Sequence, residues 1–252
     1  MKTAAILSFL LLSLGAGAQK QVSTNSQTWL GLIQQVRFSN RWGLSADLHF
    51  RTADNFVQGK NIVLGRIGAT YYPGDRTQVS AGYAHFHYYP GENHPQDARP
   101  EQRLWQQVLW TTHASRLRVQ NRLRLEERWR KHVDSRGGIT DDYDFNWRTR
   151  MQLQLLYPLG NKPFGPGSLA LMAADEAMLN LGREIQYNIF DQNRLIAGVQ
   201  LQVNKNDFLQ IGYMHIFQQQ ASGNKYRQSH VARIYYTRNI DLRRQRTVAV
   251  TL

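Results

Sequence analysis

Apolar and polar residues alternate along most of this chain. From 42 to 51 the even-numbered positions are apolar and the odd-numbered positions are polar or glycine. A similar period of two recurs over 116–129, 145–157 and 194–203, with Asn121 and Glu127 as interruptions of the apolar face. Because successive side chains of a β-strand point to opposite faces, this period predicts strands with one apolar and one polar face.

Weaker or two-sided alternation predicts seven further strands and one doubtful strand at the end of the chain. Turn-forming residues such as Ser39-Asn40 and Pro73-Gly74-Asp75 separate the segments. No segment has a sustained helical period, a linker or a low-complexity run, so we expect a single all-β domain. The seven candidates cover 28–38, 61–72, 77–88, 102–113, 168–176, 208–218 and 228–237, and the doubtful one covers 243–252.

The first 18 residues have the three parts of a secretory signal peptide. Met1-Lys2 is a short positive region, residues 4–14 are apolar, and Ala16-Gly17-Ala18 supplies the small residues of a cleavage site. The apolar run is too short for a membrane anchor, although a buried N-terminal helix is an alternative interpretation. We expect cleavage after Ala18, which leaves residues 19–252 as the folded domain.

Three all-β architectures fit the alternation: a soluble sandwich, a soluble barrel and a membrane barrel. A soluble β-protein turns its apolar face inward, whereas an outer-membrane barrel turns that face to lipid and lines its lumen with polar side chains. Most candidate strands are long enough for the ~9–11 residues that cross a bilayer obliquely and exceed the usual ~5–6 of soluble strands. Aromatic residues such as Trp42, Tyr71 and Trp129 lie near strand ends, where interfacial girdles form. We therefore predict a transmembrane antiparallel β-barrel of about 10–12 strands with a polar, Arg-rich lumen.

The order of the connections differs from the usual topology of such barrels. With both termini in the periplasm, the first connection is expected to be a long extracellular loop. Residues 39–41 are instead a short turn. An undetected strand near the N-terminus, or two strands merged around 168–193, would restore the expected order.

Composition and charge narrow the classes of function. The 252 residues include 31 Lys+Arg and 18 Asp+Glu, so the formal net charge is +13, or +12 once Lys2 leaves with the signal peptide. Such a charge in the cytosol would indicate nucleic acid, but the export signal argues against that partner. The mean hydropathy of −0.52 excludes a bundle of membrane helices. The absence of cysteine excludes disulfides, Cys-ligated zinc and thiol catalysis.

Arginine dominates the polar face of the four best strands. That face carries nine arginines against two acidic residues, Asp47 and Glu126. A guanidinium group stays charged, and its planar fork suits carboxylate or phosphate. The lumen is therefore expected to bind a small anionic or lipid-like molecule, to conduct anions, or to be plugged by arginines paired with glutamines and with Glu101, Glu126, Asp175 and Glu176. The candidate lumen residues are Arg51, Arg103, Arg116, Arg118, Arg122, Arg124, Glu126, Arg128, Arg148, Arg150, Asp175, Glu176 and Arg194.

Metal binding and catalysis have a weaker basis in the sequence. His85 and His87 share one strand face and His94 follows in the next loop, but no carboxylate has the spacing of a metal site, so no metal or other cofactor is expected. A lipid-modifying barrel enzyme remains an alternative, although the chain has no Gly-x-Ser-x-Gly motif. A soluble periplasmic barrel that carries a ligand is another. The serines and histidines available to an enzyme are Ser80, His85, His113 and Ser115.

Eight short motifs follow one another along residues 29–194. They are Trp29-Leu30-Gly31, Arg41-Trp42-Gly43-Leu44, Leu64-Gly65-Arg66, Ala81-Gly82-Tyr83, Glu101-Gln102-Arg103-Leu104-Trp105-Gln106-Gln107, the run from Arg122 to Arg128, Asp175-Glu176 and the run from Phe190 to Arg194. In this order they resemble the domain-of-unknown-function 2490 family of predicted outer-membrane barrels in Gram-negative bacteria. The resemblance implies that location and fold and supplies no activity, and residues 243–252 have no counterpart in it.

The sequence thus predicts a non-enzymatic outer-membrane barrel that binds or passes small anionic or lipid-like molecules. Its expected partners are outer-membrane lipids, the barrel-assembly machinery that would insert it and a small anionic solute.

Overall fold

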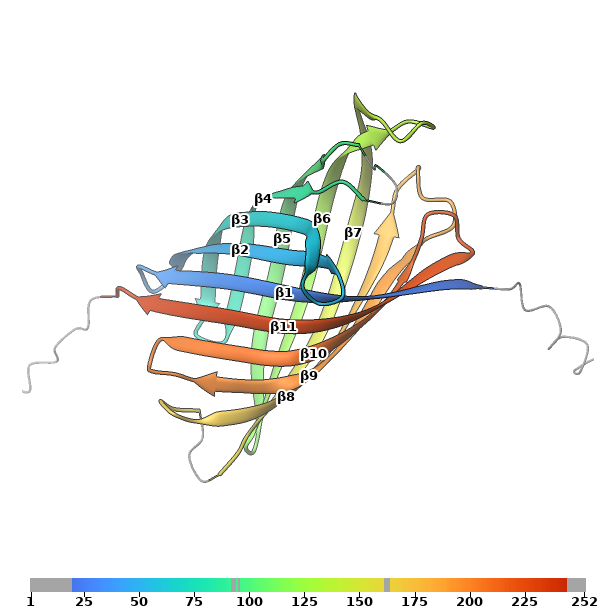
Figure 1. The fold of residues 1–252 in the computed structure, drawn as a ribbon. Coiled ribbons are helices and arrows are strands. Elements are labelled where there is room, and N and C mark those ends of the chain that lie inside the picture. The colour runs from blue at the N-terminus through green and yellow to red at the C-terminus, as the bar shows by residue number, and fades with distance from the viewer. Residues whose placement is uncertain (1–19, 92–93, 95, 161–163, 244–252) are drawn as a thin grey trace, which may run out of the picture.

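A computed structural model shows that the chain forms one closed β-barrel of eleven strands (Figure 1). The structure describes residues 20–91, 94, 96–160 and 164–243. The predicted signal peptide and cleavage site lie outside the described residues, as does the doubtful strand 243–252 apart from Arg243. The strands are β1 (Gln21–Arg37), β2 (Trp42–Asp54), β3 (Gln58–Gly74), β4 (Thr77–Tyr88), β5 (Arg99–Ala114), β6 (Leu117–Val133), β7 (Ile139–Pro158), β8 (Leu169–Leu181), β9 (Phe190–Gln202), β10 (Asp207–Gln219) and β11 (Lys225–Asp241).

The strands agree in number and place with the eleven predicted from alternation, and all but β4 are longer than predicted. The strand expected over 28–38, for example, begins at Gln21, and the one expected over 145–157 begins at Ile139. Most of the residues added at 21–27 and 139–144 are polar, so the hydrophobic pattern gave no sign of them. The described part of the chain contains no helix long and apolar enough to span a membrane.

The barrel closes through a parallel pair, which corrects the prediction of an entirely antiparallel barrel. Strands β1 and β11 run side by side in the same direction, from Gln21 opposite Lys225 to Arg37 opposite Asp241 (Figure 1). All other neighbours are antiparallel. Because the number of strands is odd, β1 begins at one end of the barrel and β11 ends at the other.

This closure accounts for the unexpected order of short and long connections. Within the described residues no strand precedes β1, and β8 and β9 are separate strands joined by residues 182–189. Neither an additional N-terminal strand nor a pair of merged strands around 168–193 is therefore present in this part of the chain. We call the end of the barrel that holds connections 38–41, 75–76, 115–116, 159–168 and 203–206 the turn rim. The opposite end, with connections 55–57, 89–98, 134–138, 182–189 and 220–224, is the loop rim.

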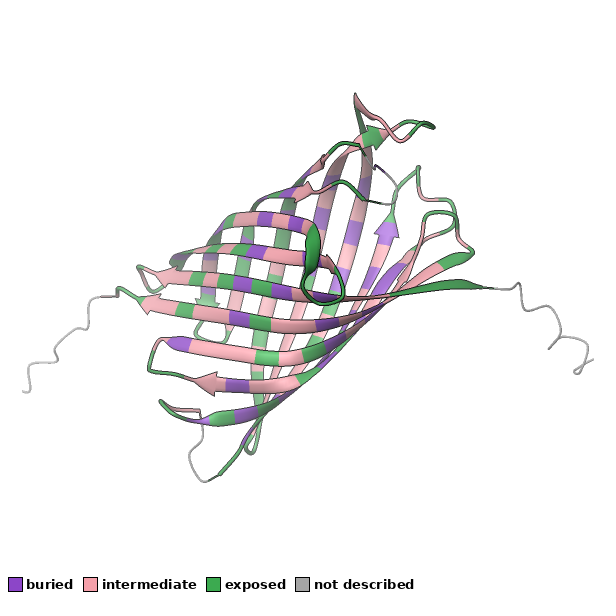
Figure 2. Ribbon diagram, viewed as in Figure 1, coloured by how far each residue is buried: buried purple, intermediate pink, exposed green. Residues whose placement is uncertain are grey.

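Each strand presents one face to the lumen and the other to the exterior, and Figure 2 shows the resulting alternation of burial along the strands. On β2 the predicted faces are confirmed, since Leu44 and Leu48 are exposed outside whereas His49 is buried inside. On β6 the same holds for exposed Leu123 and buried Arg124. The barrel is therefore apolar outside and largely polar inside.

Two apolar clusters occupy parts of the inner wall. The first, on β1 and β7–β11, includes Trp29, Met214 and Val231, and the second, on β3–β5, includes Leu64 and Trp105. The Trp105 ring lies over two glycines, because a Cβ on Gly68 or Gly82 would come within 3.0 Å of the indole. Charged side chains occupy other positions of the inner wall, mostly on β5–β9.

Candidate functional site in the barrel lumen

The lumen encloses a cavity of about 680 Å³ with a strongly basic wall. Arginine supplies all of its Lys/Arg charge among the described residues, and three carboxylates and twelve glutamines accompany it. The arginines are Arg51, Arg66, Arg99, Arg103, Arg118, Arg122, Arg128, Arg130, Arg148, Arg150, Arg194, Arg227 and Arg233, and the carboxylates are Glu101, Glu176 and Asp191.

The register of β5, β6 and β7 sets arginines directly opposite one another. Arg103 faces Arg128, and Arg124 faces Arg150. Like charges in such cross-strand pairs destabilise a sheet unless counter-charges separate them. Glu101 does so for the first pair, because its Oε1 accepts hydrogen bonds from Arg103 Nε at 2.7 Å and Arg128 Nε at 2.6 Å.

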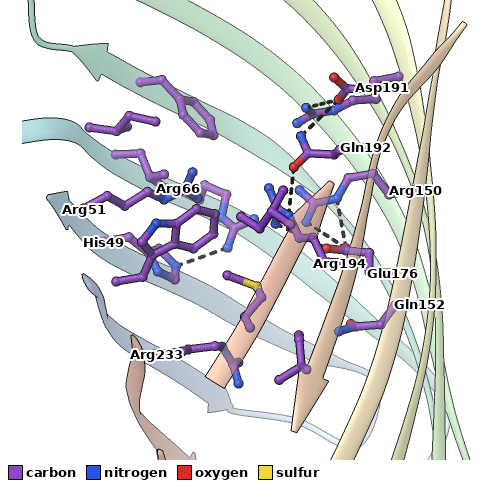
Figure 3. Close-up of a pocket in the computed structure, with 18 of the residues that line it drawn as sticks. His49, Arg51, Arg66, Arg150, Gln152, Glu176, Asp191, Gln192, Arg194 and Arg233 are labelled. Atoms are coloured by element: carbon purple, nitrogen blue, oxygen red, sulfur yellow. Dashed lines mark hydrogen bonds and ion pairs between the residues drawn. The ribbon is translucent and has the colours of Figure 1, made fainter. Parts of the chain in front are cut away.

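Three more carboxylates extend these contacts over β6–β9. Glu126 accepts hydrogen bonds from Arg148 Nη2 at 2.6 Å and from Arg150 Nη1 at 2.9 Å. Glu176 accepts one from Arg150 Nη2 at 2.8 Å. Figure 3 shows Arg150 and Arg194 converging on Glu176, with Asp191 beside Gln192. We call this set the arginine–carboxylate layer; it comprises Glu101, Arg103, Arg122, Arg124, Glu126, Arg128, Arg148, Arg150, Glu176, Asp191 and Arg194.

The layer is almost fully withdrawn from solvent. Glu101 is 0% exposed, and Glu126 and Glu176 are each 2% exposed. A charge buried this deeply is tolerated only when it is paired and hydrogen-bonded, since losing one partner leaves the other unsatisfied. The layer therefore ties five strands together and narrows the middle of the lumen.

Aromatic rings also hold guanidinium groups in place in the lumen. The Arg51 guanidinium carbon lies 3.6 Å from the centroid of the Trp29 ring, and that of Arg194 lies 5.0 Å from the same ring. Arg103 lies 3.5 Å from the Phe86 ring centroid. Cations over aromatic faces are attracted by the ring quadrupole, so these rings stabilise Arg51, which has no carboxylate partner among the described residues, and add to the ion pairs of Arg103 and Arg194.

A second ion-pair group lies on β2 and β3. Asp47 accepts a hydrogen bond from Arg66 Nε at 2.7 Å, and His49 Nε2 lies 3.0 Å from the same carboxylate oxygen. Figure 3 shows His49 and Arg66 pointing toward one another from adjacent strands. This group neutralises one further arginine of the cavity wall.

Several lumen arginines have no carboxylate partner among the described residues. Arg51, Arg118 and Arg233 lie in no ion pair within 4.0 Å. Arg118 instead covers the Phe164 ring at 3.7 Å, and Arg233 Nη2 donates to Gln210 Oε1 at 3.0 Å. Their positive charge remains available to an anion in the cavity.

The family of the chain follows from comparison with family models. A model described as "Protein of unknown function (DUF2490)" matches residues 26–227. The chain belongs to this family. Comparison with curated proteins and with solved structures finds no match.

In this DUF2490 barrel, eleven of the thirteen predicted lumen residues point into the lumen, and two do not. Arg116 lies in the turn between β5 and β6, where its guanidinium donates to the carbonyl oxygens of Pro158 and Gly160. Asp175 is exposed on the outer wall and accepts a hydrogen bond from Asn193 Nδ2 at 2.6 Å. Adjacent residues of a strand cannot share a face, so Glu176 excludes Asp175 from the lumen.

The histidines and serines weighed for other chemistry are dispersed in the DUF2490 barrel. His85 is exposed outside, whereas Ser80 is buried inside and is hydrogen-bonded to Thr70 at 3.0 Å. His113 is exposed near the turn rim, next to the turn that contains Ser115. Among the described residues, no group of three His, Asp or Glu side chains could hold a metal ion.

Some lumen residues of the DUF2490 barrel were not identified from sequence. Arg66, Asp191 and Arg233 lie on segments whose alternation is weak, so the sequence did not show which face they occupy. Arg233 lies two residues before Tyr235, which is buried inside, and therefore shares its face of β11. Arg66 could have been found by pairing with Asp47, which lies directly opposite it.

The arginine–carboxylate layer predicts different stabilities for two neighbouring substitutions in the DUF2490 barrel. Glu126→Gln removes the charge that Arg148 and Arg150 share, so we expect it to lower the free energy of unfolding by about 3–5 kcal/mol. Glu127→Gln is the matched control, because Glu127 lies outside, where Gln106 is the one residue of the described chain that hydrogen-bonds to its side chain. We expect that change to cost less than about 1 kcal/mol. Urea unfolding followed by tryptophan fluorescence measures both, and equal losses would contradict the assignment of the two faces.

Proposed function

We propose that this protein is an outer-membrane β-barrel that binds or passes small anionic molecules through its lumen. The observation that carries the proposal is the excess of arginine in the lumen. Thirteen guanidinium groups line the cavity, against three carboxylates on its wall and three more, Asp47, Glu126 and Asp144, that pair with wall arginines. A lumen with such a wall attracts anions and repels cations, as basic rings do in anion-selective pores.

The outer wall supports a location in a membrane. Large apolar side chains are exposed on every strand, and soluble monomers rarely leave so large an apolar surface in water. In outer-membrane barrels the same surface faces lipid. Its leucines include Leu30 at 42%, Leu48 at 55%, Leu123 at 45%, Leu153 at 45%, Leu171 at 50% and Leu195 at 53% exposure.

Binding of an anion and its passage, the two proposed activities, use different parts of the lumen. The arginine–carboxylate layer satisfies most of its own charges and narrows the passage. Arg118 and Arg233, which have no carboxylate partner among the described residues, lie nearer the turn rim. An anion that enters from that rim meets these two arginines first. Their guanidinium groups can replace part of its hydration shell with charge-assisted hydrogen bonds. Binding at this position therefore precedes passage through the layer.

The membrane half of the proposal predicts the effect of a charge on the outer wall. We expect Leu123→Arg to lower the free energy of unfolding of the vesicle-folded protein by about 2–4 kcal/mol, since arginine would face hydrocarbon. The matched control is Val57→Arg, at a connection where the side chain is 81% exposed. That change is expected to stay within about 0.5 kcal/mol.

Urea titration of the vesicle-folded protein measures both variants. Extraction of the wild-type protein by buffer without detergent, together with an effect of Leu123→Arg no larger than that of Val57→Arg, would overturn the membrane location.

The lumen half of the proposal predicts anion selectivity that depends on Arg118 and Arg233. We expect the wild-type barrel to bind phosphate in titration calorimetry or to give an anion-selective reversal potential in planar bilayers. The double variant Arg118→Gln/Arg233→Gln removes two uncompensated charges and should weaken both signals. Arg41→Gln, outside the strands and exposed, is the control that should leave them unchanged. A barrel that neither binds phosphate nor prefers anions contradicts the proposal.

A further inference from the structure

A layer of glutamines lies inside the barrel between the arginine–carboxylate layer and the turn rim. Six strands contribute one glutamine each, and each of these residues lies within four positions of its strand's end at this rim. All six line the cavity. We call them the glutamine layer; its members are Gln35, Gln78, Gln120, Gln154, Gln200 and Gln210.

Part of the glutamine layer is used for contacts within the wall. Gln154 Nε2 donates to Gln120 Oε1 at 2.9 Å, and Gln210 Nε2 donates to Gln200 Oε1 at 2.8 Å. Each pair joins residues that lie directly opposite on neighbouring strands. These bonds fix the orientation of the amides, because a glutamine that accepts through Oε1 must present its Nε2 elsewhere.

The rest of its hydrogen-bonding capacity faces the cavity. Within the described part of the chain, the Nε2 groups of Gln120 and Gln200 donate to no protein atom, and the side chains of Gln35 and Gln78 form no hydrogen bond. A primary amide carries two donors and one acceptor oxygen, so the layer offers both kinds of group. Two uncompensated guanidinium groups, those of Arg118 and Arg233, lie in the same part of the cavity.

This combination is more specific than an anion site. A simple inorganic anion needs donors alone, and the amide oxygens of the glutamine layer would repel it. A sugar hydroxyl both donates and accepts a hydrogen bond, as an amide does. A carboxylate on the sugar would match the planar fork of arginine, which binds carboxylates bidentately.

We infer that the glutamine layer binds an acidic saccharide, with amides on its hydroxyls and Arg118 and Arg233 on its carboxylates. The inference rests on the proposed function, because the saccharide must reach the lumen as an anion does. It adds the class of ligand, a short chain of uronic acid units.

Three probes test the inference with the full mature chain folded in detergent. We expect a trimer of galacturonic acid to bind about tenfold more tightly than the neutral trimer of galactose or inorganic phosphate at equal ionic strength. Titration calorimetry measures all three. Equal binding of the acidic and neutral trimers, or of the acidic trimer and phosphate, would overturn the inference.

Substitutions of the amides locate the binding. Gln35→Met/Gln78→Met keeps the side-chain length and breaks no protein hydrogen bond, so the variant should fold and should bind the acidic trimer about fivefold more weakly. Gln34→Met is the matched control, because Gln34 is exposed on the outer face next to Gln35. Gln120→Met/Gln200→Met is a second pair with the same expected direction. Unchanged affinity in both double variants would overturn the inference.

The outcomes separate this inference from the proposed function. If phosphate binds or the bilayer current prefers anions while the acidic trimer gains nothing over phosphate, the inference fails and the proposed function stands. If the barrel shows no preference for any anion, both fail.

Discussion

Guanidinium groups enclosed in a barrel must find negative charge within the barrel, and this constraint organises the structure. Seven arginines and four carboxylates meet on the inner faces of β5–β9. Each carboxylate except Asp191 contacts at least two arginines, so a few acids hold apart many like charges. Of the remaining cavity arginines, Arg66 and Arg99 pair with Asp47 and Asp144. Arg51, Arg118 and Arg233 instead contact aromatic rings or a glutamine, and these three have charge to offer a ligand.

The same constraint divides the lumen into regions with different roles. The buried arginine–carboxylate layer stabilises the barrel, because breaking it leaves charges without partners in a site that water hardly reaches. The glutamine layer and the two uncompensated arginines lie toward the turn rim. A stabilising layer and a binding layer can therefore coexist in one lumen. The plugging and the solute binding that the sequence suggested would then occur at different positions along the barrel axis.

Much of the fold follows from the sequence because a strand has a side-chain period of two. The faces of β2 and β6 were predictable, since apolar and polar residues alternate there with few interruptions. On β8 apolar residues lie on both faces, so the sequence could not show that Glu176 points inward and Asp175 outward. The contact of Arg103 with Glu126 depends on the register between strands, which no local pattern fixes. The parallel closure of β1 on β11 joins residues about 200 positions apart, beyond the reach of local pattern.

In the arrangement that we propose, the apolar face of each strand meets lipid while the polar face lines the lumen. Because the chain has no cysteine, single cysteines at Leu153 and Gln154, adjacent residues on opposite faces of β7, can each carry a fluorescent label. The measurement is quenching of each label by brominated lipid in vesicles. We expect strong quenching for the label at Leu153→Cys, which would face lipid, and little for the label at Gln154→Cys, which would face the lumen. Equal quenching at the two positions, or the reverse order, would contradict this arrangement.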